Sequence, residues 1–179
     1  MGRRRNKNKE FSNLEVIDAG AKGKTIAKAP DGKVIFLPNA VPGDVVDVQT
    51  FKQRSGYYEG KATAFHKLSE KRTQAACEHF GTCGGCKWQH MDYSHQLFYK
   101  EKEVVNNLKR IGHLELPEIT PILGSKAQYF YRNKMEFSFS DSRWLTQEEI
   151  ASDNDLGDRN ALGFHIPGMW DKILDVKKC

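Results

Sequence analysis

Four cysteines constrain this chain more strongly than any other feature of its sequence. Three of them, Cys77, Cys83 and Cys86, stand in a C-x5-C-x2-C arrangement in the segment CEHFGTCGGCKWQH, and the fourth is Cys179. Two residues between cysteines let adjacent thiolates converge on one inorganic core, and the two glycines in that gap let the backbone wrap closely around it. This spacing predicts a binding loop.

The residues by themselves leave the chemistry of this loop open. A disulfide framework is not expected, because the cytoplasm keeps thiols reduced. Zinc would use the same thiolates in a tetrahedral site and would recruit His79 or His90, although zinc ribbons usually pair two C-x2-C turns and this chain has a single one. Buried thiols without a ligand are a third interpretation. The spacing favours a [4Fe-4S] cluster over zinc by a small margin.

Composition and charge predict a cytoplasmic protein. Hydrophobic residues make up 39% of the chain, but there is no apolar run of about 18 residues, so a transmembrane helix is not expected. The N-terminal MGRRRNKNKE has no apolar stretch behind its charges, so a secretory signal is not expected either. The net charge of +5 is concentrated in residues 1–10, which are predicted to form a disordered basic arm that supports RNA binding weakly.

Short strands separated by strong turn signals are predicted between residues 14 and 66. The strands are expected at 14–19, 33–37, 44–50 and 57–65. Pro30-Asp31-Gly32 and Pro42-Gly43-Asp44 each supply a preset backbone angle followed by a residue that tolerates positive φ, which suits a hairpin. Four or five strands in about 55 residues predict a small closed barrel, because closure removes the edges of the sheet.

The second part of the chain mixes helical and extended patterns. Residues 92–111 carry an apolar stripe with helical spacing and end at Gly112, so a helix is predicted there. Residues 129–140 alternate with period two and predict an amphipathic strand, whereas the polar residues 147–158 predict an exposed loop. A final hairpin is expected around Gly168. The predicted fold class is mainly β, with a mixed α+β second part.

The order of these features resembles the bacterial RNA 5-methyluridine methyltransferases, in particular the cluster-containing 23S ribosomal RNA group. The segment DAGAKGKTIAKAPDGKVIFLPNAVPGDVVDVQ is similar to a TRAM domain, which is an OB-like RNA-binding barrel. The C-x5-C-G-G-C pattern with a distant fourth cysteine is similar to the family's [4Fe-4S] motif. The resemblance implies a TRAM barrel at 11–68 and an iron–sulfur-binding central domain at 69–179.

The same resemblance assigns the cysteines. It implies that a [4Fe-4S] cluster is held by Cys77, Cys83, Cys86 and Cys179. Iron–sulfur then ranks well above zinc, and a polar or core role becomes the expected one for His79 and His90. The cluster is expected to be structural, tying the return of the chain to the cysteine loop, with redox sensing as the alternative.

RNA contacts are implied for the segment YRNKMEF. It is similar to the family's substrate-facing strand, and Arg132 and Lys134 lie on its polar face, where they would meet phosphate or a base edge. The residues alone equally allow a solvated strand face with an ion-pair ladder. In the barrel, Phe51, Tyr57 and Tyr58 are possible stacking platforms, although each by itself is expected to be a core residue.

The activity implied by the resemblance is methyl transfer from S-adenosylmethionine to uracil through a cysteine nucleophile. All four cysteines are assigned to the cluster, and no strand–glycine-loop–helix unit suits the methyl donor, so no catalytic and no donor-binding residue is assigned in this chain. The Rossmann-like catalytic domain is expected to be absent. The helix at 92–111 is expected to pack on that domain, and its exposure would allow an otherwise monomeric chain to self-associate.

Three other interpretations stay open. Radical enzymes that use S-adenosylmethionine also carry TRAM domains, but their cluster motif is C-x3-C-x2-C. A noncatalytic RNA-binding module with an iron–sulfur or zinc site is a rival from a different class. A tRNA uracil-5 methyltransferase is the third, although such relatives generally lack both the cluster motif and the barrel. The expected partner is therefore 23S rRNA, with neither DNA nor a membrane.

Overall fold

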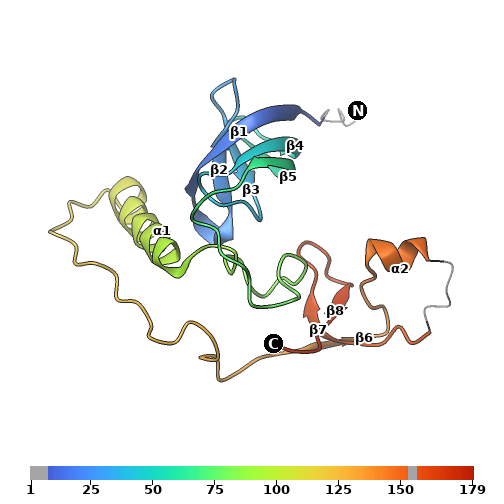
Figure 1. Ribbon diagram of the computed structural model, residues 1–179. Coiled ribbons are helices and arrows are strands. Elements are labelled where there is room, and N and C mark those ends of the chain that lie inside the picture. Colours follow the sequence, from blue (N-terminus) through green and yellow to red (C-terminus); the bar gives the residue numbers. More distant parts are fainter. Residues whose placement is uncertain (1–7, 153–156) are drawn as a thin grey trace. The chain divides into compact units, whose positions relative to one another are not determined.

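The structure is a computed structural model that describes residues 8–152 and 157–179 (Figure 1). Contacts divide the chain into two compact units that alternate along the sequence. The first contains the residues up to Gln74 together with His90–Lys126, and the second contains Ala75–Gln89 and Ala127–Cys179. Most of the expected basic arm lies outside the described residues. The expected division into domains at 11–68 and 69–179 stays a prediction.

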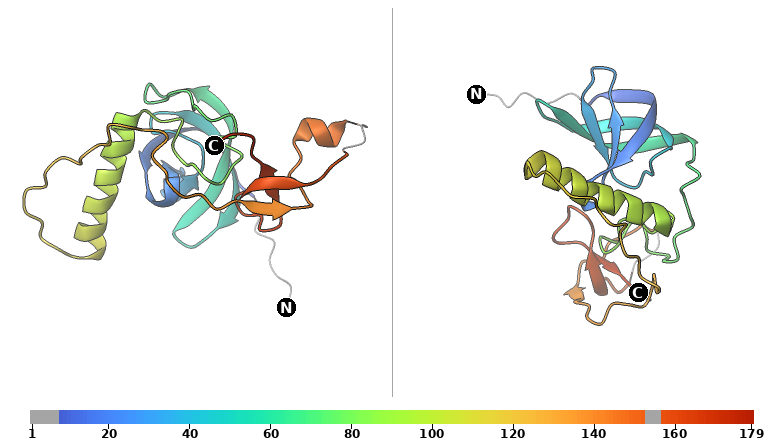
Figure 2. Two further views of the ribbon diagram at one scale, coloured as in Figure 1. Left: turned by 90° about the horizontal axis from the view of Figure 1, so that it is seen from below. Right: turned by 90° about the vertical axis from the view of Figure 1, so that its left-hand side faces the viewer.

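The first unit is built on the closed barrel that the sequence predicts. Its strands are β1 (Glu10–Ala19), β2 (Thr25–Lys28), β3 (Val34–Leu37), β4 (Val45–Gln53) and β5 (Tyr57–Lys67). They close in the order β1-β2-β3-β5-β4, and Figure 2 shows the closed wall from two sides. Neighbouring strands are antiparallel except β3 and β5, which run parallel. The short strand β2 was missed by the sequence prediction.

Alternation of side chains explains why these segments form a barrel. In β3, Ile35 and Leu37 are fully buried, and the alternating residues Val34 and Phe36 are half-buried on the outer face. Burial of one face of each strand removes apolar area from water, which is the main driving force for closure. The two predicted turns are confirmed, since Gly32 and Gly43 have φ values of +80° and +101° that glycine adopts readily. The mainly β fold class is thereby confirmed.

A buried ion pair holds the chain where it leaves the barrel. The carboxylate of Asp44 is fully buried and accepts hydrogen bonds from Nε and Nη2 of Arg72 at 2.8 and 2.7 Å. The backbone N–H groups of Val41 and Ser69 donate to the same carboxylate at 2.6 and 2.9 Å. Burial opposes the ionisation of Asp44, but these hydrogen bonds outweigh it and hold the pKa of its carboxyl below the usual value.

The helix predicted at 92–111 is confirmed. Helix α1 spans Tyr93–Asn106 and continues as a π-helical turn through Asn107–Ile111 up to Gly112. Its N-terminus is capped by Asp92, whose carboxylate accepts the N–H of Ser94 at 2.9 Å.

Helix α1 lies beside the barrel within the first unit. Lys102 Nζ is 2.7 Å from Asp18 Oδ2 at the end of β1, and Tyr99 is buried. The predicted apolar stripe includes Val104 and Leu108, which line an apolar groove together with Leu116, Ile119 and Ile122. Self-association through this helix stays a prediction. In the part of the chain that the structure describes, no helix has the length and apolar character needed to span a membrane.

The second unit contains a three-stranded antiparallel sheet. Its strands are β6 (Ser138–Ser140), β7 (Ala161–His165) and β8 (Ile173–Asp175), in the order β6-β7-β8. The hairpin predicted around Gly168 is confirmed, and this glycine has a φ of +83° in the turn between β7 and β8. After this turn the chain continues through β8 to Cys179.

The loop predicted at 147–158 is wrong at its start, where helix α2 spans Gln147–Ala151. The cause is a capping box. Thr146 Oγ1 accepts the N–H of Glu149 at 3.2 Å, and Glu149 Oε2 accepts the N–H of Thr146 at 2.9 Å. The sequence signal for this helix was the Thr-x-x-Glu spacing.

The strand predicted at 129–140 is also wrong over most of its length. Only β6, its last three residues, forms hydrogen bonds with another strand, in the register Ser138↔Gly163 to Ser140↔Ala161. A β-strand exists only where a neighbouring strand pairs with its N–H and C=O groups, and β7 pairs with this segment only through Ala161–Gly163. Phe130, at φ +58°, interrupts the extended conformation as well.

Candidate functional site

All four predicted cluster ligands belong to the second unit, and each of these cysteines is a free thiol. The first three lie on a loop made of successive tight turns rather than on a helix or strand. The N–H of Phe80 donates to the carbonyl of Cys77 at 3.1 Å, and the N–H of Cys83 donates to the carbonyl of His79 at 2.9 Å. The loop expected from the cysteine spacing is therefore present, and its binding of a metal stays a prediction.

The pKa of the Cys83 thiol depends on burial and on the other three cysteines. Burial raises the pKa of the Cys83 thiol, and the thiols of Cys86, Cys77 and Cys179 raise it further through electrostatic repulsion between their charged forms. The N–H of Gly85, 3.3 Å from Cys83 Sγ, acts in the opposite direction. The tertiary structure thus returns the last residue of the chain to the electrostatic environment of the loop.

The side chains of Gln89 and His79 form hydrogen bonds that hold this loop in place. The side-chain oxygen of Gln89 accepts the N–H of Cys77 at 3.1 Å, while Nε2 of the same amide is 3.1 Å from Cys86 Sγ. His79 Nε2 accepts the N–H of Lys177 at 3.3 Å and so ties the C-terminal strand end to the loop. Sequence reasoning missed Gln89, whereas the hydrogen bond of His79 agrees with the polar role that the resemblance implied for it.

The glycine between Cys83 and Gly85 allows close packing of the loop against the sheet. A Cβ atom at Gly84 would lie 2.9 Å from the carbonyl oxygen of His165 at the end of β7, closer than real Cβ contacts. The predicted need for glycine in the short gap is supported at this position.

The donor set suits an iron–sulfur cluster in its chemistry. Four thiols lie in one unit, and N–H groups of Gly85 and Gln89 point at the sulfurs of Cys83 and Cys86. Within residues 8–152 and 157–179, however, no three His, Cys, Asp or Glu side chains form a group close enough to hold a metal ion. Cluster ligation by these cysteines therefore stays a prediction.

His90, the other histidine considered for zinc, belongs to the first unit. Its side chain is buried and its Nε2 is 3.2 Å from the carbonyl oxygen of Ala40. Burial lowers the pKa of its imidazole, and the nearby guanidinium of Arg72 lowers it too. His90 is a core residue of the barrel unit, as the resemblance implied.

The outer face of the barrel carries a second candidate site, here called the barrel patch. It consists of Lys24, Phe36, Lys52, Tyr57 and Glu59, all half-buried. The rings of Phe36 and Tyr57 meet edge to face, with centroids 5.4 Å apart and planes at 75°. The Glu59 carboxylate holds Lys24 Nζ at 3.1 Å and Lys52 Nζ at 2.6 Å.

Strand pairing assembles this patch from distant parts of the sequence. Phe36 on β3 is paired with Glu59 on the parallel strand β5, and Lys52 on β4 is paired with Glu59 from the other side. Phe36 was missed as a candidate, although the alternation of the segment VIFL places it on the face opposite to Ile35 and Leu37.

The three aromatic residues considered for stacking differ in how deeply they are buried. Tyr58 is fully buried and its hydroxyl donates to Asp31 at 2.6 Å, so it is a core residue as expected. Phe51 is exposed at an irregularity of β4, and Tyr57 lies in the barrel patch. The expectation of a core position is therefore confirmed for Tyr58 and wrong for Phe51.

Arg132 and Lys134 are both exposed on the irregular segment that precedes β6. Lys134 Nζ is 2.7 Å from Glu136 Oε1, and the two side chains are 82% and 80% exposed. Such surface ion pairs contribute about 0–1 kcal/mol. The pair matches the ion-pair interpretation of this segment, while RNA binding by Arg132 and Lys134 stays a prediction.

Comparisons with known proteins agree with this arrangement. Residues 12–63 match the TRAM domain family, and these residues form nearly all of the barrel. An uncharacterized RNA methyltransferase of Bacteroides thetaiotaomicron is 55% identical over 89% of this chain and 35% of its own length. A similar protein of Porphyromonas gingivalis, also named an uncharacterized RNA methyltransferase, is 44% identical over 93% of this chain and 36% of its own length.

One relative with a named activity is the 23S rRNA (uracil(1939)-C(5))-methyltransferase RlmD of Francisella tularensis subsp. novicida, 38% identical over 75% of this chain and 30% of its own length. Among solved structures, the Pyrococcus abyssi tRNA (uracil-54, C5)-methyltransferase in complex with S-adenosyl-L-homocysteine matches 93% of this chain and 32% of its own, with 23% identity and a TM-score of 0.49. The chain spans about a third of the length of the curated relatives it matches.

Proposed function

We propose that this chain, whose residues 12–63 match the TRAM domain family, belongs to the TRAM-containing RNA methyltransferases. In this proposal it is the RNA-binding and cluster-binding part of an S-adenosylmethionine-dependent enzyme that forms 5-methyluridine in 23S rRNA. The observation that carries the proposal is the barrel patch, which places two aromatic rings and two lysines on the outer face of the matched TRAM domain.

The barrel patch suits single-stranded RNA. Bases stack on Phe36 and Tyr57, and each such contact is worth about 1–3 kcal/mol. Lys24 and Lys52 meet the phosphates. Glu59 keeps both ammonium groups next to the rings before RNA arrives, and a phosphate then competes with this carboxylate for them. The patch therefore binds RNA without reading its sequence.

The second unit would hold the cluster through its four thiols. A bound [4Fe-4S] cluster would cross-link the loop at Cys77–Cys86 to Cys179. The chain's own contribution is to prepare that site: His79 holds the backbone next to Cys179, and N–H groups of Gly85 and Gln89 stabilise negative charge on two of the sulfurs. The role of the cluster in this proposal is structural.

Methyl transfer itself is proposed for the full-length enzyme. With all four cysteines of this chain assigned to the cluster, the nucleophile that attacks uracil and the residues that bind S-adenosylmethionine would come from the portion of the relatives that this chain does not match. This chain alone is expected to bind RNA and to transfer no methyl groups. Turnover by the chain with 23S rRNA and S-adenosylmethionine would contradict that expectation.

RNA binding by the barrel patch is tested by fluorescence anisotropy with a labelled single-stranded RNA. Phe36→Ala and Tyr57→Ala are each expected to weaken binding by about 1–3 kcal/mol. Lys24→Gln is expected to reduce the slope of log Kd against log salt by about 0.7, the value for one phosphate contact with a single strand. Phe51→Ala is the matched control, because Phe51 is exposed but lies outside the patch. Equal loss in the Phe51 variant would argue against the patch.

The metal is tested by purifying the chain without oxygen and measuring iron, sulfide and zinc. Cys86→Ser is expected to abolish the iron content and the visible absorbance, and to destabilise the second unit by several kcal/mol, because metal binding and folding are coupled. Zinc without sulfide would favour the zinc module instead. Comparison of 23S rRNA with tRNA as ligands distinguishes the two proposed substrate classes.

A further inference from the structure

Glu59 is the acidic residue of the barrel patch, and its neighbours lie on three adjacent strands. It is paired with Phe36 on β3 and with Lys52 on β4, so these side chains leave the barrel wall beside it. Tyr57 lies two residues earlier on β5 and therefore projects from the same face of that strand. Paired residues on neighbouring strands have Cβ atoms about 4.5–5.5 Å apart. The carboxylate is therefore a direct neighbour of the stacking surface.

Lys24 connects this carboxylate to the aromatic rings through contacts of known length. Its Nζ is 3.1 Å from Glu59 Oε2 and 5.9 Å from the centroid of the Phe36 ring. The Phe36 centroid is in turn 5.4 Å from the centroid of Tyr57. The carboxylate, an ammonium group and both rings thus form one continuous surface within the first unit, which a single nucleotide can span.

The Glu59 carboxylate can accept a further hydrogen bond. The ammonium of Lys52, and then that of Lys24, hold the pKa of its carboxyl below the usual value, so it is ionised. Each oxygen accepts a hydrogen bond from one ammonium group, whereas an ionised carboxylate has about four acceptor sites. The side chain is only 16% exposed, which leaves access for a small donor such as a hydroxyl group. A phosphate is repelled by its charge.

RNA carries such a donor beside every base, because its ribose has a 2′-hydroxyl that DNA lacks. We propose that Glu59 accepts a hydrogen bond from the 2′-hydroxyl of a nucleotide whose base stacks on Phe36, and that this contact makes the barrel patch select RNA over DNA. The rings and the lysines bind both kinds of strand, because bases and phosphates are common to the two. Glu59 is therefore the specificity-determining residue of the patch.

The charge of Glu59 contributes to this selection. A carboxylate in the middle of a phosphate-binding patch repels the backbone of either strand, so it weakens the binding of DNA and RNA alike. Only a strand with 2′-hydroxyl groups offsets this repulsion by donating to the carboxylate. The inference rests on the proposed binding of single strands by the barrel patch and adds recognition of the sugar to it.

The test compares three labelled single strands of equal length by fluorescence anisotropy: an oligouridine, an oligodeoxyuridine and a 2′-fluoro oligouridine. The 2′-fluoro sugar keeps the pucker of RNA but donates no hydrogen bond. The chain is expected to bind the oligouridine about tenfold more tightly than the other two, the lower end for a hydrogen bond to a charged group. Equal binding of the oligouridine and the 2′-fluoro strand would show that the pucker is recognised, and would overturn the proposal.

Glu59→Met removes both acceptor oxygens and keeps a side chain of similar length. This variant is expected to bind the oligouridine and the oligodeoxyuridine equally, and to bind the oligodeoxyuridine more tightly than the parent chain does, because the repulsion is gone. Glu59→Gln keeps one uncharged acceptor oxygen and is expected to retain part of the preference. A tenfold preference that persists in Glu59→Met would overturn the proposal.

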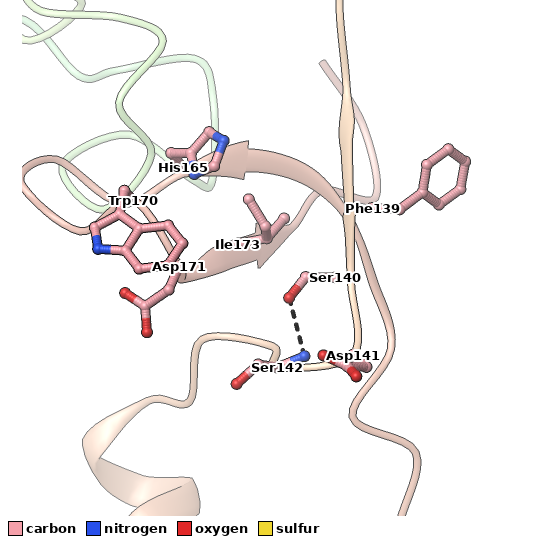
Figure 3. Close-up of a pocket in the computed structure, with 8 residues that line it drawn as sticks. All are labelled: Phe139, Ser140, Asp141, Ser142, His165, Trp170, Asp171 and Ile173. Carbon is pink, nitrogen blue, oxygen red and sulfur yellow. Dashed lines mark hydrogen bonds between the residues drawn. The ribbon is translucent and has the colours of Figure 1, made fainter.

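Two control variants lie outside the barrel patch. Glu10→Gln neutralises a carboxylate on β1 that accepts a hydrogen bond from the side chain of Gln49. Trp170→Ala removes an indole that is 87% exposed in a hollow of the second unit, where Figure 3 shows it beside Asp171. Both variants are expected to keep the ratio of RNA to DNA affinity. Loss of the preference in either would assign sugar recognition to another surface and overturn the proposal.

The outcomes separate this inference from the proposed function. Equal affinity of the parent chain for all three strands would overturn recognition of the 2′-hydroxyl and leave single-strand binding by the barrel patch intact. Binding of none of the strands would overturn both.

Discussion

The side-chain amide of Gln89 donates a hydrogen bond to the sulfur of Cys86 over 3.1 Å. Through its oxygen, the same amide accepts the N–H of Cys77 at the other end of the loop. One residue therefore connects the first and third cysteines of the motif, although it is not itself a thiol. Hydrogen bonds to sulfur stabilise a thiolate and hold its orientation, as second-layer groups do around other metal ligands.

Replacement of Gln89 by leucine removes both hydrogen bonds at little change in volume. We expect the variant to bind less iron and to lose its visible absorbance faster in air than the parent chain. Iron analysis and the decay of absorbance measure this. Gln49→Leu is the control, because Gln49 is a glutamine on the barrel that bonds to Glu10. Identical decay in the parent and the Gln89 variant would exclude a role for this amide.

Gly84→Ala places a methyl group against the carbonyl oxygen of His165. The cysteine loop must then shift away from β7, and overpacking of this kind costs about 1–3 kcal/mol. Thermal unfolding and iron content are both expected to fall. Gly56→Ala serves as the matched control, since nothing lies within 4 Å of a Cβ atom at that position. Normal iron content in the Gly84 variant would show that the loop tolerates displacement.

The Asp44–Arg72 pair is expected to be the most sensitive ion pair of the barrel unit. Arg72→Met leaves the fully buried carboxylate of Asp44 without its charged partner, which costs about 3–5 kcal/mol. The comparison is Glu136→Gln, which breaks the exposed pair with Lys134 and is expected to change stability by less than about 1 kcal/mol. Urea unfolding measures both, and similar values for the two variants would contradict this interpretation.

The pKa of Asp44 also predicts an acid dependence. Because the folded pKa lies below the usual value, the carboxylate contributes its full stabilisation above the unfolded pKa of about 3.9, and the contribution is lost as pH falls through the folded pKa. The free energy of unfolding of the parent chain should therefore decrease more steeply below about pH 4 than that of Asp44→Asn. Parallel curves for the two proteins would rule this out.

His90 predicts a second transition at higher pH. Burial lowers the pKa of its imidazole, so the neutral ring stabilises the fold above the unfolded pKa of about 6.5, and this stabilisation is lost as pH falls through the folded pKa. His90→Gln should flatten the stability curve between neutral pH and that folded pKa. His113→Gln, at an exposed position after helix α1, is the control. Unfolding in urea at a series of pH values measures the difference.

Local chemistry made much of the fold predictable. Gly32, Gly43 and Gly168 adopt the positive φ values that their turns require, and Asp92 caps the helix that the apolar stripe predicts. These features depend on residues a few positions apart, so the sequence alone determines them. The missed helix α2 belongs to the same class, because its Thr146–Glu149 capping box was present in the sequence.

Features that depend on distant partners were decided only by the tertiary structure. The alternation at 129–140 is compatible with a strand, but β7 offers partners only for Ser138–Ser140, so the remainder stays irregular. Phe36 and Tyr57 meet because β3 and β5 pair in parallel, which no local pattern reveals. Whether a segment pairs depends on the free energy of contacts across the whole unit rather than on its own propensity.

The cysteine site also combines features set by the sequence with features set by the tertiary structure. The sequence by itself determined how many thiols there are, their C-x5-C-x2-C spacing and the glycines that allow a tight loop. Only the tertiary structure brought Cys179 into the electrostatic environment of Cys83, through the β7–β8 hairpin and the contact between Lys177 and His79. The physical reason is that closing so long a loop costs conformational entropy, which packing of the second unit must offset.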